Sequence, residues 1–437
     1  METWRLLDTR PMSAAENMAL DETLVELKGR GKTPNTIHFL QFDPWAVLVG
    51  FHQSVSEEVR LDYCKENNIE VNRRVTGGGA IFFDKSQLGW EVVCDKSFFH
   101  MKMANNRLFR LLCEPVVTAL RRLGIESAFR PRNDIEVDGR KISGTGGTES
   151  GNAFLFQGTM LTDFDVDTML RCLRIPVEKL KAKEIDSVKE RVTCLKWELG
   201  RVPDLKTIKA AICEGFESHL GIRLQPGPLT REEAALFKAK LPGFQSTRWI
   251  DMVKTPVNRH EVVQSAYKND DGLVRFTFVV DLQNRRVRNV FITGDFLSFP
   301  TRALYDMEAQ LRGARLKKVE LHDIIRRFFE TGRIHIPGMS HEDFLKPVDQ
   351  VLKKVSIARY GIPLEYCNLI SVTNGSFEAV LKRHPSVLLL PYCAKDLDCS
   401  LRHKKGCTAC GNCSVGYEGQ GGPGLYRVLL PALFYQT

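Results

Sequence analysis

The rest of this 437-residue chain is organised around one stretch, Arg73-Arg74-Val75-Thr76-Gly77-Gly78-Gly79-Ala80-Ile81-Phe82-Phe83-Asp84. It places two arginines and a threonine before three consecutive glycines, and a strand-like apolar run follows. Because glycine has no Cβ, a ligand can approach its backbone N–H closely. Arginine can bind an anion at the same place. The stretch therefore predicts a cradle for an activated acyl group and its phosphate, with a tight hairpin turn beside a solvated arginine pair as the alternative.

The composition is that of a globular protein, with 43% hydrophobic and 26% charged residues, and the length predicts roughly two to four domains. The start, Met1-Glu2-Thr3-Trp4, has neither the basic nor the apolar region of a signal peptide. No apolar run approaches the roughly 20 residues of a membrane helix. We therefore expect a cytoplasmic protein without a membrane partner.

The net charge of +9 is spread along the chain. Such a surface could meet nucleic acid, steer an acidic protein partner, or simply be solvated. The charge by itself does not choose among these three, and the motifs described below argue against a nucleic-acid partner.

Five of the twelve cysteines crowd together near the C-terminus, at Cys393, Cys399, Cys407, Cys410 and Cys413. In a cytosolic protein such a cluster indicates metal rather than disulfides. Two-residue spacing lets successive thiolates converge on one centre, which fits either zinc or an iron–sulfur cluster. The other seven cysteines are scattered singly and are typical of small buried residues.

The first half of the chain alternates helix and strand patterns. Ser13 and Glu16 form a capping box at the start of a helix that we expect to end near Lys28. A second helix is expected over 105–123. The expected strands are Thr36–Leu40, Ala46–Val49, Ala80–Phe83 paired with Trp90–Val93, and Phe154–Thr162.

A hairpin is expected around Asp138-Gly139, a dipeptide typical of tight turns between strands, and Lys141 lies on its second strand. Residues 165–200 are basic and helix-prone, which fits a flap over an anion or a plain exposed helix pair. Pro242–Asn258 is loop-like and marks a boundary. Beyond it, Leu273–Asp281 and Val287–Thr293 are expected strands, and a following helix suggests a small α+β domain.

Several motifs together resemble the lipoate–protein ligase family over residues 3–235. They are Asn17–Glu22, Arg73–Ala80, Asn133-Asp134, Arg140–Gly144 and Ser187–Thr193. The resemblance implies an α+β fold with a mixed sheet flanked by helices, shared with biotin protein ligases. It also implies two reactions: lipoate and ATP, with Mg²⁺, give lipoyl-adenylate, and a carrier lysine then attacks the mixed anhydride. The implied carriers are apo lipoyl domains of 2-oxoacid dehydrogenase E2 subunits and the glycine cleavage H protein. Lipoate and octanoate stay open as the acid.

Within this resemblance, we expect Lys141 to be the catalytic cation that spans the carboxylate and the α-phosphate. A surface lysine at a hairpin tip is the alternative. Asp134 could help to hold Mg²⁺. The expected adenylate and acyl site consists of Arg73, Arg74, Thr76, Gly77, Gly78, Gly79, Ala80, Asn133, Asp134, Ser143, Gly144, Gly158 and Thr159. Gln157 departs from the family, which commonly has a histidine just before this glycine.

The domains that we expect are a catalytic domain at 1–240, an accessory domain at 255–345 and a cysteine-rich metal-binding domain at 351–437. Gly294-Asp295-Phe296 resembles the accessory domain of these ligases, which in the family is thought to move between the two steps. The C-terminal cysteines resemble a domain of unknown function.

Two rival functions stay open. An ATP-independent octanoyltransferase would use a nucleophilic cysteine, but Ser127–Arg130 holds none at the place where such enzymes have one. The second rival is a metal-binding regulatory or nucleic-acid-binding protein whose ligase domain has decayed. Lys141 and the intact glycines argue against it.

Overall fold

A computed structural model of the chain describes residues 1–99, 106–130, 134–174, 188–253, 261–332 and 334–358, with the backbone alone at 387–393 and 425–431. The first part is built on an eight-stranded sheet in the order β11-β1-β2-β6-β10-β9-β8-β7. β1 runs parallel to β2 and β11, and the other neighbours are antiparallel. Its strands are β1 (Glu2–Asp8), β2 (Thr36–Leu40), β6 (Leu88–Asp95), β7 (Ala128–Arg130), β8 (Asp134–Val137), β9 (Arg140–Ser150), β10 (Ala153–Met160) and β11 (Ile222–Pro226).

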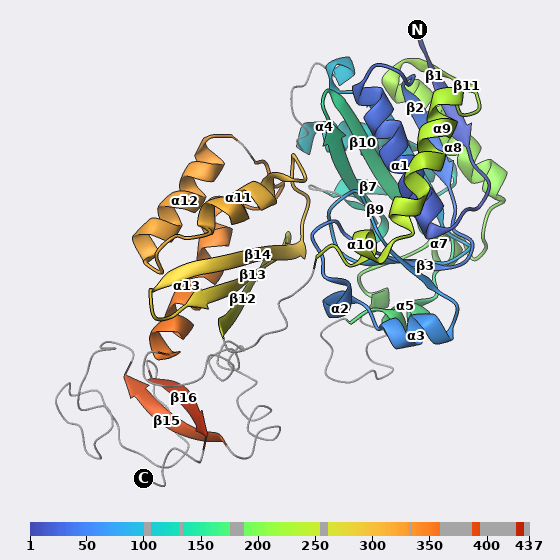
Figure 1. The fold of residues 1–437 in the computed structure, drawn as a ribbon. Helices are drawn as coiled ribbons and strands as arrows, with labels where there is room; N and C mark the ends of the chain where they lie inside the picture. Colours follow the sequence, from blue (N-terminus) through green and yellow to red (C-terminus); the bar gives the residue numbers. More distant parts are fainter. Residues whose placement is uncertain are drawn as a thin grey trace.

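Helices cover both faces of this sheet (Figure 1). One face carries α4 (Asn106–Arg122) and α8 (Leu205–Leu220), and the other carries α1 (Ala14–Gly29) and α9 (Arg231–Phe244). The predicted capping box of α1 is confirmed, since Ser13 and Glu16 bond to each other's backbone N–H. The expected mixed sheet flanked by helices is therefore confirmed.

A smaller sheet in the order β4-β3-β5 lies beside the large one. It consists of β4 (Glu70–Arg73), β3 (Ala46–Val49) and β5 (Ile81–Phe83), and its core is shared with the short helices α2 (Val55–Glu58), α3 (Leu61–Glu66) and α5 (Val166–Cys172). The short helix α7 (Leu195–Leu199) packs into the core of the large sheet, and the 3₁₀ helix η1 (Lys96–Phe99) follows β6. The predicted pairing of strands 80–83 and 90–93 is wrong. β5 pairs with β3, whereas β6 pairs with β2 and β10. Alternating hydrophobicity marks a strand but does not choose its partner.

The second part is a three-stranded antiparallel sheet with helices packed against it (Figure 1). The predicted pair is confirmed as β13 (Gly272–Asp281) and β14 (Arg286–Asp295). The sequence analysis missed β12 (Val262–Asn269), a strand that mixes polar and apolar residues. Its helices are α11 (Ala303–Leu311), α12 (Lys318–Glu330) and α13 (His341–Ala358).

The loop predicted at 242–258 is in part helical. α9 runs through Pro242 to Phe244, and α10 (Thr247–Ile250) follows, because the Ser246 side chain accepts the backbone N–H of Trp249 and caps it. α13 spans residues 346–350, which separate the expected domains 255–345 and 351–437. Residues 254–260 lie outside the described residues.

Near the C-terminus, β15 (Val387–Cys393) and β16 (Leu425–Pro431) form an antiparallel pair. Cys399, Cys407, Cys410 and Cys413 lie outside the described residues, and Cys393 is described only as backbone. The cysteine metal centre therefore stays a prediction. Within the described ranges, no helix is long and apolar enough to cross a membrane.

Candidate active site

Lys141 lies at the start of β9, just after a tight turn. Asp138 and Gly139 both have positive φ, 49° and 77°, as the predicted Asp-Gly turn requires. Before the turn, β8 has a register shift between Ile135 and Glu136. The Lys141 ammonium lies 2.7 Å from Asp134 Oδ1, and the two side chains are 36% and 19% exposed. This hairpin thus presents a cation–carboxylate pair that solvent can reach.

The segment before α7 runs beside this strand. The Lys141 N–H donates to Arg191 O, and Thr193 N–H donates to Lys141 O, both at 2.8 Å. Arg140 adds an ion pair with Glu198 of α7 at 2.9 Å. The described part of the predicted flap is therefore bonded to the lysine strand. Residues 175–187, which hold three of the flap's lysines and Ser187, lie outside the described residues.

Arg73 holds loops together rather than facing an anion. Its fully buried guanidinium donates to the carbonyls of Gly50, Phe51 and Gln53 at 2.7–3.0 Å. It also reaches Trp249 O and Ile250 O of α10 at 3.2 and 2.8 Å. Burial lowers the pKa of Arg73 to about 10, so it stays charged at neutral pH. A role of Arg73 in lining the acyl and phosphate pocket therefore stays a prediction, while its contacts here are with backbone carbonyls.

Arg74 is committed to the glycine loop itself. It donates to Gly77 O at 3.0 Å and Gly79 O at 2.8 Å, and to Thr76 Oγ1 at 3.3 Å. A further bond reaches Leu48 O at 2.8 Å. Burial lowers its pKa to about 10 as well. In this structure the side chain shapes the loop from behind.

The second domain covers the glycine loop. Gly78 N–H donates to Phe296 O at 2.9 Å. A Cβ at Gly77 would lie 2.4 Å from the same oxygen, so this approach requires glycine. His52 Nε2 lies 3.0 Å from Ser298 Oγ, and burial lowers the pKa of His52 to about 3, which keeps the imidazole neutral. Nothing in the sequence pattern showed that segment 294–298 rests on this loop.

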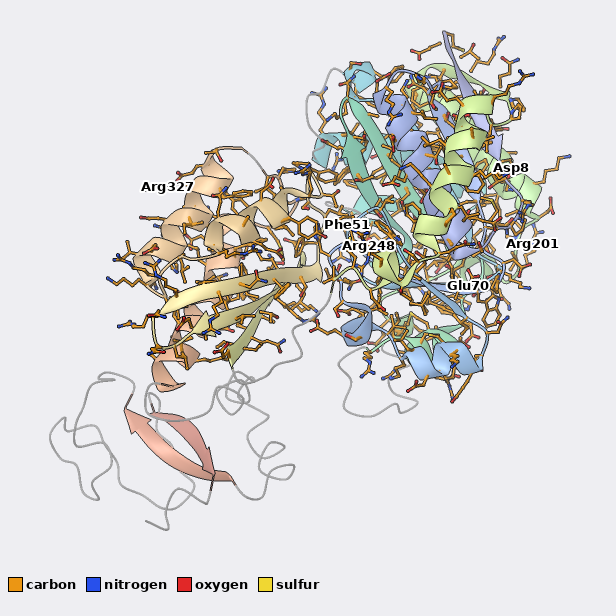
Figure 2. The ribbon with its side chains drawn as sticks, viewed as in Figure 1. Asp8, Phe51, Glu70, Arg201, Arg248 and Arg327 are labelled. Atoms are coloured by element: carbon orange, nitrogen blue, oxygen red, sulfur yellow. The ribbon has the colours of Figure 1, made fainter. Side chains whose placement is uncertain are left out.

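The aromatic side chain of Phe51 marks the same boundary. Figure 2 shows Phe51 where the two domains meet, and its ring lies 6.2 Å from that of Tyr305 in α11. An ion pair between Arg275 and Glu58 at 2.7 Å adds to the contact. The second domain therefore contacts the first through several polar and aromatic side chains.

β9 connects the two predicted halves of the site. Gly144, beside the Lys141 ammonium, donates its N–H to Thr159 Oγ1 at 3.2 Å. Further along, a Cβ at Gly146 would lie 3.6 Å from Thr76 Oγ1 of the glycine loop. Asn133 lies outside the described residues. Of the remaining expected residues, Ser143 is buried, Ala80 is half-buried and Gly158 packs against the Trp90 ring.

The described cysteines differ from an activated nucleophile. Burial raises the pKa of the Cys194 thiol to about 11 and of Cys213 to about 12, and it also raises those of Cys94 and Cys113. Cys64 and Cys172 hydrogen-bond to each other, which lowers the pKa of Cys64 and raises that of Cys172. Five of these six thiols are buried, and Cys213 is half-buried. Among the described residues, then, no cysteine combines an exposed thiol with a low pKa.

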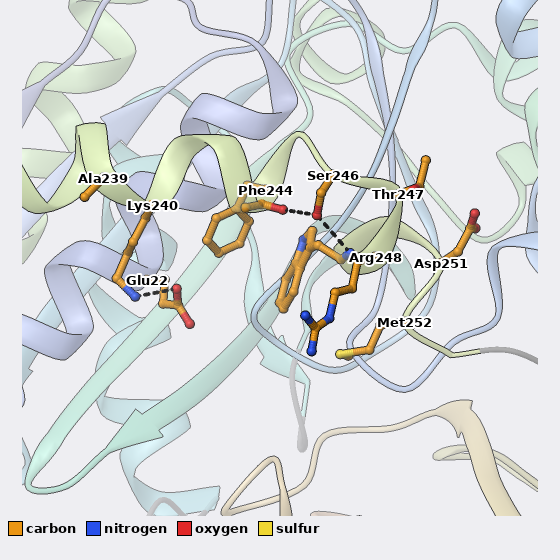
Figure 3. A pocket seen from close by; sticks show the side chains of 11 residues that line it. Glu22, Ala239, Lys240, Phe244, Ser246, Thr247, Arg248, Asp251 and Met252 are labelled. Carbon is orange, nitrogen blue, oxygen red and sulfur yellow. Dashed lines mark hydrogen bonds and ion pairs between the residues drawn. The ribbon is translucent and has the colours of Figure 1, made fainter.

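A groove of about 860 Å³ lies along α9 and α10, and no residue of the lysine hairpin is among those that line it (Figure 3). Lys240 forms ion pairs of 2.7 Å with Glu22 and Glu26 at one end. At the other end Trp249 donates its indole N–H to Asn72 Oδ1 and Arg73 O, both at 3.1 Å. Trp249, which lines the groove, therefore also binds the Asn72–Arg73 end of β4. The sequence analysis did not predict this groove.

Comparisons with known proteins agree with this architecture. A model of the "Lipoyl protein ligase A/B catalytic domain" matches residues 13–217. The octanoyltransferase LipM of Symbiobacterium thermophilum is 32% identical over 260 residues, which are 53% of this chain and 92% of that protein. LipM of Kyrpidia tusciae is 28% identical over 271 residues, 57% of this chain and 98% of that protein.

Solved structures extend the likeness. A bi-partite lipoate protein ligase from Thermoplasma acidophilum, described with its E2 lipoyl domain, has a TM-score of 0.52 at 28% identity and covers 59% of this chain and 100% of its own. Lipoate-protein ligase A bound with ATP has a TM-score of 0.51 at 27% identity, over 58% of this chain and 100% of its own. LipL1 of P. falciparum, in complex with lipoate, has a TM-score of 0.60 at 17% identity, over 80% of this chain and 99% of its own, and shows a shared fold beyond the catalytic domain.

Proposed function

This chain belongs to the lipoyl protein ligase A/B catalytic-domain family, and from that membership we propose that it is an ATP-dependent lipoate–protein ligase. Enzymes of this family transfer lipoyl or octanoyl groups, and this chain is one of them. The observation that carries the finer proposal is the Lys141–Asp134 pair, a solvent-reachable ammonium in a described region that offers no activated thiol. Adenylation needs a fixed cation rather than a protein nucleophile.

The proposed reaction has two balanced steps. A carboxylate oxygen of lipoate or octanoate attacks the α-phosphorus of ATP, and pyrophosphate leaves. The neutral amine of a carrier lysine then attacks the acyl carbonyl, AMP leaves, and the amine loses a proton as the amide forms. Lys141 would stabilise the negative charge that develops first on the phosphoryl oxygens and then on the carbonyl oxygen.

The residues present fit the expected Mg²⁺. Asp134 supplies a hard oxygen donor next to the phosphate-binding cation, and Mg²⁺ binds one or two carboxylates together with substrate phosphates. The ion would neutralise phosphate charge when it is bound. Lys141 Nζ lies 2.7 Å from Oδ1 of this carboxylate, so the ion pair would separate for Asp134 to bind Mg²⁺.

The acceptor would be a lipoyl domain. The bi-partite ligase from Thermoplasma acidophilum is described with its E2 lipoyl domain, which supports an E2 subunit as one carrier class. The glycine cleavage H protein stays a second predicted carrier. A cytoplasmic location stays a prediction.

The test is mass spectrometry of an apo lipoyl domain incubated with the full-length protein, Mg²⁺ and either acid, with and without ATP. We expect the mass of one acyl group to appear only with ATP, and to disappear when Lys141 is replaced by alanine. Lys206→Ala, which removes an exposed lysine of α8, is the matched control. Equal acylation without ATP would overturn the proposal.

The second candidate is the ATP-independent octanoyltransferase, and the names of the curated relatives favour it over the ligase. A thioester route needs a cysteine near Lys141. Cys113 of α4 hydrogen-bonds to Thr145 of β9, four residues beyond the lysine, although its thiol is buried. Transfer from an octanoyl carrier protein without ATP, lost in Cys113→Ser, would establish this route instead.

The cysteine-rich segment suggests an additional metal-binding role. Elemental analysis of anaerobically purified protein should find zinc or iron, and a visible absorption band would select iron–sulfur. Finding neither metal would contradict the role. A decayed ligase with a nucleic-acid function predicts salt-sensitive DNA or RNA binding and no acylation.

A further inference from the structure

Three polar side chains meet between α1 and the large sheet. Asp21 comes from α1, His38 from β2 and Glu91 from β6, and all three are 0% exposed. His38 and Glu91 lie directly opposite each other in the antiparallel register. One donor atom from each residue lies within 4.8 Å of the other two. We call these three residues the buried triad.

Each ring nitrogen of His38 has a polar neighbour. The Thr9 hydroxyl oxygen lies 3.1 Å from His38 Nε2 and within hydrogen-bond distance, 3.2 Å, of Phe39 O. When the Thr9 hydroxyl donates to Phe39 O, Nε2–H donates to Thr9 and Nδ1 keeps its lone pair; when the hydroxyl donates to Nε2, Nδ1 carries the proton. Nδ1 lies 2.8 Å from Glu91 Oε2. Two lone pairs at that distance repel unless a proton or a cation lies between them.

The remaining oxygens of the triad also need a positive partner. Asp21 and Glu91 face each other closely enough to share a hydrogen bond, which requires a proton on one of them, and neither Asp21 oxygen nor Glu91 Oε1 has another side-chain donor among the described residues. Gln157 of β10 stands opposite Glu91 in the register, and its buried Oε1 has no donor among the described residues either. Buried carboxylates without partners are costly, because burial removes the hydration that stabilises their charge.

We propose that the buried triad is a binding site for a divalent metal ion, with zinc as the ion that it fits best. Zn²⁺ binds both imidazole nitrogen and carboxylate oxygen in proteins, and a divalent charge neutralises both carboxylates. Thr9 can accept the Nε2 proton and so hold the imidazole with Nδ1 toward the ion, as outer hydrogen-bond partners commonly do for metal-bound histidines. Gln157 Oε1 is available as a further oxygen ligand.

The site would fasten α1 to the sheet rather than take part in acyl transfer. All of its donors are buried, so the ion would enter as the domain folds, and binding would add directly to stability. α1 also pairs with α9 through Lys240, so the metal would anchor two helices on this face. The proposal is independent of the proposed ligase activity.

The experiment uses full-length protein without a histidine tag. We expect the wild type to carry one more divalent ion than the double variant Asp21→Asn, Glu91→Gln. Removal of metal by refolding in chelator should lower the Tm of the wild type by about 5 to 10 °C, and added Zn²⁺ should restore it. Substitution with Co²⁺ should give a spectrum without thiolate charge transfer when the C-terminal cysteines are replaced by serine.

The matched control is Asp167→Asn, which removes an exposed carboxylate of α5 and should keep the wild-type metal content. Equal metal content in the wild type and the double variant would overturn the proposal. So would a wild-type Tm that neither chelator nor Zn²⁺ changes, a readout that does not require the variant to fold. The triad would then be a pair of carboxylic acids that share protons with His38.

Discussion

The lysine hairpin and the arginine–glycine loop carry the same kind of charge and use it in opposite ways. Lys141 is 36% exposed and has Asp134 as its ion-pair partner. Arg73 is completely buried and donates to five backbone carbonyls. A cation surrounded by carbonyls stabilises the loops around it, whereas a half-exposed cation can exchange its partner for a substrate. Burial, not charge, separates the structural cation from the candidate catalytic one.

The largest effect that we expect is on activity. Lys141→Met should lower carrier acylation by about 10³-fold, or about 4 kcal/mol, because it removes the cation that stabilises the transition-state charge. The free energy of unfolding should change by less than about 1 kcal/mol, since an exposed ion pair contributes little. Acylation rates and urea unfolding of the same samples measure both. If Lys141→Met instead lowered the free energy of unfolding by several kcal/mol and left the acylation rate unchanged, Lys141 would be the structural cation.

Arg73→Met should do the opposite. Loss of the guanidinium leaves several buried carbonyls without donors, and we expect a cost of about 3 kcal/mol in unfolding free energy. Urea denaturation measures this cost. Arg248→Met is the matched control, because Arg248 is an exposed arginine of the neighbouring helix α10. Equal stability of the two variants would show that Arg73 is not the structural cation of the loop.

The covering domain provides a pH test of buried charge. Burial raises the pKa of Glu308 in α11 to about 7, although Ile292 N–H donates to its Oε1 at 2.6 Å. Because the folded protein favours the protonated carboxyl, Glu308 contributes its full stabilisation below the unfolded-state pKa of about 4.5. This contribution is lost as the pH rises through the folded-state pKa of about 7. Thermal unfolding between pH 4.5 and 8 should therefore show a loss of about 2 kcal/mol that Glu308→Gln removes. If Glu308→Gln lost the same stability between pH 4.5 and 8, the pH dependence would come from other groups.

The smallest effect concerns the contact between the two domains. Ser298→Ala removes the hydroxyl that meets His52, at a cost of about 1 kcal/mol to domain closure. Hydrogen exchange at the Gly78 amide, which bonds to Phe296 O, should quicken several-fold. Ser218→Ala, in the distant helix α8, is the control. Unchanged exchange at Gly78 would mean that the accessory domain closes without this contact.

Local patterns predicted most of the elements that position the site. The capping box at Ser13 and the Asp138-Gly139 turn act within a few residues, so their sequence signals are direct. The pairing of the lysine strand β9 with β8 follows from that turn. By contrast, β5 and β6 were paired wrongly, because a strand's partner depends on which apolar faces are buried together.

By itself, the sequence determined the family, the mixed sheet and the position of Lys141, since these depend on motifs whose order and spacing are readable along the chain. Only the tertiary structure decided what each charge does. Arg73 and Lys141 look equivalent as cations in a motif, yet carbonyls from segments up to 177 residues away surround the arginine. The buried triad draws on α1, β2 and β6 and has no local signature. Burial and long-range contacts determine the role of a charged group, and the adjacent residues in the sequence predict neither.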